Sequence, residues 1–120
     1  MTPQDLQDRT KLFAVRVMKL AEFLEKNPLS KLIGRQIFRS GTSTAANYRA
    51  ACKAKSVRDF ISKLGIVVEE ADETIFWLEL LKESGTIDGG QLESLLQEAR
   101  EITAIMVASR NSAIKNQRSQ

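Results

Sequence analysis

The residues of this chain that are best suited to chemistry are cations. Among 120 residues there are 18 Lys or Arg and 15 Asp or Glu, which gives a formal net charge of +3. Residues 27–55 hold six basic and no acidic side chains, whereas residues 56–84 hold three basic and seven acidic ones. Dense arginine and lysine side chains suit phosphate groups. Residues 27–55 are therefore the first candidate for a functional surface.

The side chains that most enzymes use are missing. The sequence has no histidine and a single cysteine, Cys52, which we interpret as a small packing residue. A di-iron bundle site would need a Glu-x-x-His pair on two helices. Without histidine, the carboxylates are expected to form a solvated acidic face: Glu69, Glu70, Glu73, Glu98 and Glu101. We expect no enzymatic activity, no metal and no cofactor.

The spacing of apolar residues predicts four long helices, over residues 3–26, 28–53, 57–84 and 89–115, and a disordered polar tail over 116–120. Thr2, Asn27, Ser56 and Asp88 are the expected helix caps. No alternating pattern long enough for a strand occurs. The expected fold is a single all-α domain over residues 1–115, an antiparallel up-down four-helix bundle.

Five cations of the second predicted helix share one face. At about 100° per residue they fall within an arc of about 80°, opposite the apolar positions around Ile37 and Tyr48. We call this set the basic stripe, and it is the candidate nucleic-acid-binding surface: Lys31, Arg35, Arg39, Arg49 and Lys53.

Two explanations of the basic stripe remain open. Acidic residues of the third helix, Glu69 and Glu73 among them, could neutralise it within the bundle or across a subunit contact. Alternatively, the stripe binds phosphate backbones, with little sequence preference, because no aromatic residues alternate with the cations as base stacking requires.

The end of the third predicted helix is apolar on more than one side, which indicates burial against a second surface. A wide core would explain this pattern, and so would a subunit interface anchored by Trp77. The candidate interface residues are Phe76, Trp77, Leu80 and Leu81. In the second helix, Gly41 is interpreted as a point of close helix packing.

Several motifs together resemble a known bacterial family. They are Arg39-Ser40-Gly41-Thr42-Ser43, Ala46-Asn47-Tyr48-Arg49, Ser56, Asp59-Phe60-Ile61-x-Lys63-Leu64 and Glu70-Ala71-x-Glu73-Thr74-x-x-Trp77-Leu78-x-Leu80-Leu81. The chain resembles the four-helix-bundle proteins encoded in intervening sequences of 23S ribosomal RNA genes. That family also includes the accessory variability proteins of diversity-generating retroelements. Ala50 stands where the family commonly has glutamate.

The resemblance implies a cytoplasmic bacterial protein that forms a homopentameric ring and has no known enzymatic activity. It also implies nucleic acid, and in retroelement members a reverse transcriptase, as partners. From residues and resemblance together we expect a non-catalytic, oligomeric RNA- or DNA-binding accessory protein that uses the basic stripe. The alternative is a scaffold ring that docks a reverse transcriptase or another protein without touching nucleic acid. No membrane partner is expected, because no apolar run approaches the roughly 20 residues of a membrane span.

Overall fold

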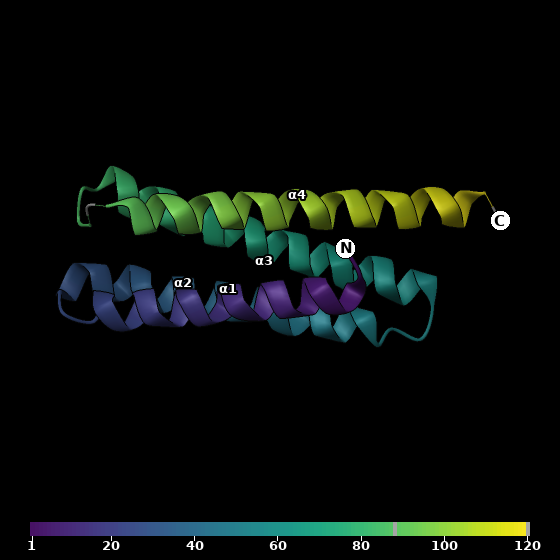
Figure 1. Cartoon of the computed structure of the whole chain (residues 1–120), viewed down its shortest axis with the longest axis horizontal. Coiled ribbons are helices and arrows are strands. Elements are labelled where there is room, and N and C mark those ends of the chain that lie inside the picture. The colour runs from purple at the N-terminus through teal and green to yellow at the C-terminus, as the bar shows by residue number, and fades with distance from the viewer. Residues whose placement is uncertain (88, 120) are drawn as a thin grey trace.

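The structure is a computed structural model that describes residues 1–87 and 89–119, and within these residues it contains four helices and no strand (Figure 1). The helices are α1 (Pro3–Leu24), α2 (Pro28–Cys52), α3 (Val57–Glu83) and α4 (Gly90–Arg118). Each begins within one residue of its predicted start. The prediction of an all-α chain with four helices is confirmed for the described residues.

The starts of the first three helices are fixed by local hydrogen bonds. Thr2 and Asp5 form a reciprocal capping box, in which the Thr2 hydroxyl accepts from the Asp5 amide at 3.0 Å. Asn27 accepts from the amides of Leu29 and Ser30, and Ser56 accepts from the amide of Asp59. These three predicted caps are confirmed.

The two ends of α4 differ from the prediction. The predicted cap, Asp88, lies outside the described residues, and the residue at the N-cap position is Gly89, with a φ of +133° and no side-chain cap bond. At its other end α4 continues to Arg118, into the segment predicted as a disordered tail. Lys115 and Arg118 lie in the last turn, where cations interact favourably with the helix dipole. Gln120 lies outside the described residues.

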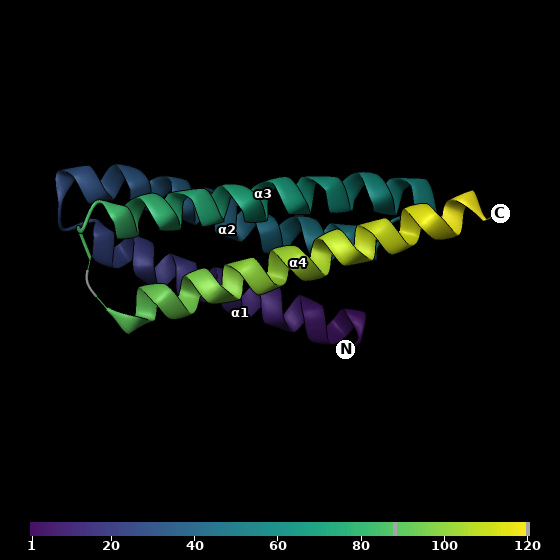
Figure 2. The same ribbon diagram turned by 90° about the horizontal axis from the view of Figure 1, so that it is seen from above.

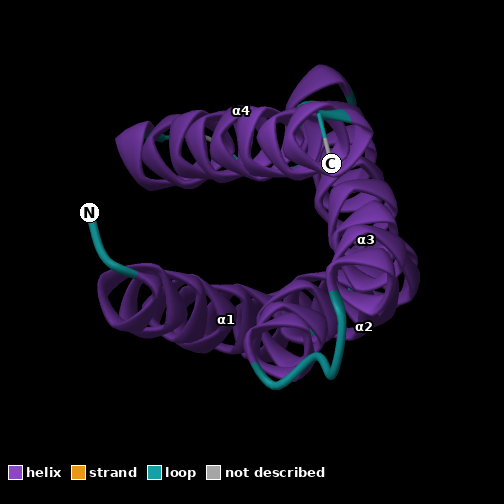
Figure 3. Cartoon of the chain, turned by 90° about the vertical axis from the view of Figure 1, so that its right-hand side faces the viewer, coloured by secondary structure: helices purple, strands orange, loops and turns teal. Residues whose placement is uncertain are grey.

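Neighbouring helices along the chain pack against each other in an antiparallel order. Figure 2 shows α4 running obliquely to α3. Seen along the long axis, α2 and α3 lie side by side, and α1 and α4 extend from them as two arms (Figure 3). The molecule measures 52 × 22 × 21 Å. Among the described residues, none of the helices is long and apolar enough to cross a membrane.

The core lies between these helices and draws on all four. Its largest fully buried side chains include Phe13, Leu24, Ile37, Leu64, Leu78, Leu96, Ile102 and Met106. The backbones of α1 and α2 approach closely at Gly41, where an added Cβ would lie 2.7 Å from Val17 Cγ1. The interpretation of Gly41 as a packing residue is confirmed.

Candidate nucleic-acid interface

Helix α2 is held on one face by the core and carries the basic stripe on another. Ile37, Gly41, Thr44 and Tyr48 are buried. A buried hydrogen bond joins α2 to α3, in which Thr74 Oγ1 donates to Ser40 Oγ at 2.8 Å. This packing fixes the rotation of α2 about its axis and thereby decides which cations face solvent.

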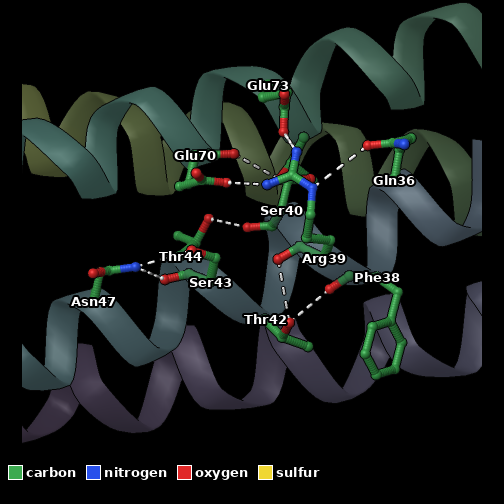
Figure 4. Close-up of polar contacts among 11 residues, drawn as sticks. Gln36, Phe38, Arg39, Ser40, Thr42, Ser43, Thr44, Asn47, Glu70 and Glu73 are labelled. Atoms are coloured by element: carbon green, nitrogen blue, oxygen red, sulfur yellow. Dashed lines mark hydrogen bonds and ion pairs between the residues drawn. The ribbon is translucent and has the colours of Figure 1, made fainter.

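Arg39, at the middle of the stripe, is paired with the acidic face of α3. Its Nη1 lies 3.2 Å from Glu70 Oε2, and its Nη2 donates to Glu73 (Figure 4). The guanidinium therefore bridges α2 and α3 within one chain. For Arg39, the structure agrees with the explanation that acidic residues of the third helix neutralise the basic stripe. The partners are Glu70 and Glu73.

Lys31 and Arg35, at the N-terminal end of the stripe, share one carboxylate of the α1–α2 connection. Lys31 Nζ lies 3.5 Å from Glu25 Oε2, and Arg35 Nε lies 4.0 Å from Glu25 Oε1. The Arg35 side chain remains 63% exposed. Surface pairs of this kind contribute between about 0 and 1 kcal/mol, so Arg35 stays available to another anion.

Arg49 and Lys53, at the C-terminal end of the stripe, are exposed and form no ion pair with any described residue. The five predicted residues thus divide into two groups. Lys31, Arg35 and Arg39 have internal partners, whereas Arg49 and Lys53 present free positive charge to solvent.

Two exposed cations that the helix-face analysis did not include, Lys55 and Arg58, follow directly in the chain. Analysis of one helix face missed them because they lie beyond the end of α2. The acid-free stretch that runs to Arg58 was the signal for them. The next residue, Asp59, is bound by Lys63, and the hydrogen bond from that ammonium, more than the nearby charge of Lys55, lowers the pKa of the Asp59 carboxyl.

Four of the five carboxylates considered as a metal site, all except Glu69, are paired with arginines. Arg9 of α1 binds Glu98 at 2.6 Å and Glu101 at 3.1 Å on α4. Hydrogen bonds from Gln97 and then Arg9 lower the pKa of Glu101. Among the described residues, no group of three or more His, Cys, Asp or Glu side chains is placed to hold a metal ion.

Tyr48 and Cys52, near the end of α2, pack in or against the core. Tyr48 is 4% exposed, and burial raises its pKa above the usual tyrosine range, so the phenol is neutral. Cys52 is half-buried against the same core cluster. These placements agree with packing roles for both residues.

The predicted subunit-interface residues on α3 include both exposed and buried side chains. Phe76 and Leu80 are 54% and 39% exposed, and Phe76 stacks edge-on against Trp77 with ring centroids 5.0 Å apart. The buried Trp77 Nε1 has no hydrogen-bond acceptor among the described residues. Leu81 corrects the prediction: it is fully buried in the core of its own chain, one turn after Leu78, and cannot contact another subunit.

Comparisons with known proteins agree on one family. The family model described as 23S rRNA-intervening sequence protein matches residues 4–108. A solved structure from Bacteroides thetaiotaomicron VPI-5482, a protein of unknown function from the S23 ribosomal protein family, is 40% identical with a TM-score of 0.82. That match covers 88% of this chain and 97% of the other. No curated protein matches the chain.

Proposed function

The chain belongs to the 23S rRNA-intervening sequence protein family, and from this premise we propose that it is a non-catalytic, oligomeric accessory protein that binds the phosphate backbone of RNA or DNA. The observation that carries the proposal is the charge of Arg49 and Lys53, which are exposed at the C-terminal end of α2 and form no ion pair with any described residue. A helix of 25 residues displays these cations without any rearrangement of the chain. Their phosphate contacts would be electrostatic.

The same surface supports backbone recognition in preference to base recognition. Discrimination between bases requires side chains that reach base edges, or aromatic platforms on which bases stack. The aromatic residue nearest Arg49 in sequence, Tyr48, is buried in the core. The protein therefore binds structured RNA or DNA with little sequence preference, and we assign this activity to the cytoplasm.

Assembly into a ring of identical subunits, a pentamer in the family this chain resembles, is the second part of the proposal. The exposed Phe76 and Leu80 support a subunit contact at this place on α3. A neighbouring subunit would bury these two apolar side chains. Because the cations would repeat around a ring, their weak individual contacts with one nucleic acid would together raise the overall affinity.

A scaffold function is the alternative, and one feature favours it. Val15, Met18, Ala21 and Phe38 line a groove between α1 and α2, and three of them are large apolar residues at least 40% exposed. Such a groove suits the apolar face of a protein partner, for example a reverse transcriptase. In that case the cations would only complement an acidic partner.

Charge reversal at Arg35 and Arg49 together separates these functions. We expect R35E/R49E to weaken binding to a structured RNA in a gel shift, with unchanged helicity and unchanged size on a sizing column, because neither residue faces the core. If the reversal breaks the assembly and the unsubstituted protein binds no RNA, the basic stripe serves subunit pairing and the proposal fails.

A further inference from the structure

Two segments that are far apart in the sequence bring exposed cations to one end of the molecule. The α2–α3 turn and the last turns of α4 lie at the same end (Figure 1). Arg110 Nε donates to the Ile61 carbonyl at 3.2 Å, and Phe60 and Asn116 line one groove, so the end of α4 packs beside the start of α3. We call the exposed cations of these segments the basic end: Arg49, Lys53, Lys55, Arg58, Lys115 and Arg118.

The positive charge of the basic end is not balanced locally. None of its six cations forms an ion pair with a described residue. The acids near this end are Asp5, Asp8 and Asp59. These three acids cannot balance six cations, and one of them, Asp59, is paired with Lys63. Because the whole chain carries a net charge of only +3, the remaining residues sum to a negative charge.

Helix stability explains only part of this cluster. Arg49, Lys115 and Arg118 lie in the last turns of α2 and α4, and Lys53 is the C-cap of α2, where cations interact favourably with the helix dipole. Lys55 and Arg58 flank Ser56, the N-cap of α3. A cation at a helix N-terminus is unfavourable for the same reason. Apart from the charge of Asp59 near Lys55, the described part of the fold gives no reason for positive charge at Lys55 and Arg58.

We infer that the basic end, and not the full length of α2, is the surface that contacts nucleic-acid phosphates. This inference rests on the proposed function and moves the contact to another surface. Lys31, Arg35 and Arg39 are paired with Glu25, Glu70 and Glu73, whereas the cations of the basic end have no ion-pair partner in the described part of the chain. Across its long axis the whole molecule measures 22 × 21 Å. A duplex carries one negative charge per roughly 1.7 Å of its axis, so several phosphates lie within reach of the six cations.

The test uses two pairs of neutral substitutions in the full-length protein. K55Q/R58Q removes two cations from the basic end, and K11Q/K19Q removes two exposed cations from α1 as the matched control. Fluorescence anisotropy measures the Kd for one RNA hairpin and for a DNA hairpin of the same sequence over a series of salt concentrations. Thermal unfolding measures the Tm of each variant.

We expect K55Q/R58Q to raise the Kd about tenfold or more for both hairpins at about 0.1 M salt. The slope of log K against log salt should become shallower by roughly two. Its Tm should equal or exceed that of the unsubstituted protein, because the substitution removes charge that opposes the α3 dipole. K11Q/K19Q should change the Kd much less, by about twofold.

Three results would overturn the inference, and they differ from a failure of the proposed function. Equal losses of affinity for K55Q/R58Q and K11Q/K19Q would mean that binding depends only on the net charge of the protein. A lower Tm with unchanged Kd would mean that Lys55 and Arg58 serve the fold. A loss of affinity for K31Q/R35Q, which leaves all six cations of the basic end in place, without one for K55Q/R58Q would return the contact to the basic stripe. If the unsubstituted protein binds neither hairpin, the proposed function itself fails.

Discussion

Gly41 shows how one residue sets the distance between two helices. An added Cβ would lie 2.7 and 2.8 Å from the two methyl carbons of Val17, which is fully buried and short. Real Cβ atoms do not approach other atoms so closely, so α1 and α2 would have to move apart. Glycine in a helix costs about 1 kcal/mol relative to alanine, and this close approach explains why the chain retains it.

Gly41→Ala is therefore expected to lower the free energy of unfolding by about 1 to 2 kcal/mol, because overpacking outweighs the gain in helix propensity. Urea unfolding followed by circular dichroism measures the change. Gly90→Ala is the control, since a Cβ there meets no atom within 4 Å and should leave stability unchanged or slightly higher. A stabilised Gly41→Ala variant would contradict the packing of α1 against α2 described above.

At the scale of elements, Arg9 ties together the two helices that diverge most. It joins α1 to Glu98 and Glu101 of α4, and these carboxylates together raise the pKa of the guanidinium. The lowered pKa of Glu101 means that its pairing stabilises the fold above the pKa of an unfolded glutamate, about 4.3, and that this contribution is lost as the pH falls through the lower folded value.

We expect Arg9→Gln to cost about 1 kcal/mol at neutral pH, with a smaller difference from the unsubstituted protein at about pH 3. Urea unfolding at both pH values provides the measurement. Lys11→Gln, an exposed neighbour on α1 without an ion pair among the described residues, is the control. An Arg9→Gln deficit of the same size at both pH values would show that lost packing, and not the ion pairs, accounts for the effect.

The sequence predicted those features of the elements that depend on nearby residues. The caps Thr2, Asn27 and Ser56 act within three or four residues, and the starts of α1, α2 and α3 were predicted correctly. The pairing of Arg39 with Glu70 and Glu73 depends on the rotation of α2 relative to α3, which helical periodicity does not determine. Leu81 was misplaced for the same reason, because an apolar residue beside the core stripe is compatible with either surface.

At the scale of the whole molecule, the exposed apolar surface of α3 leads to a prediction about assembly. We expect F76S/L80S to reduce the oligomer size measured by light scattering and to retain helicity, because neither side chain is buried in the core of the single chain. L29S, which changes another exposed leucine at the start of α2, should leave the size unchanged. A monodisperse monomer of the unsubstituted protein at micromolar concentration would contradict a subunit contact on α3.

The salt dependence of RNA binding by the unsubstituted protein tests the central claim most directly. Anisotropy titrations of a structured RNA between about 50 and 200 mM salt give the slope of log K against log salt. Phosphate contacts by several cations predict micromolar or tighter binding at low salt and a slope steeper than about −3. Binding that does not change over this range, or no binding at low salt, would contradict recognition of a nucleic-acid backbone.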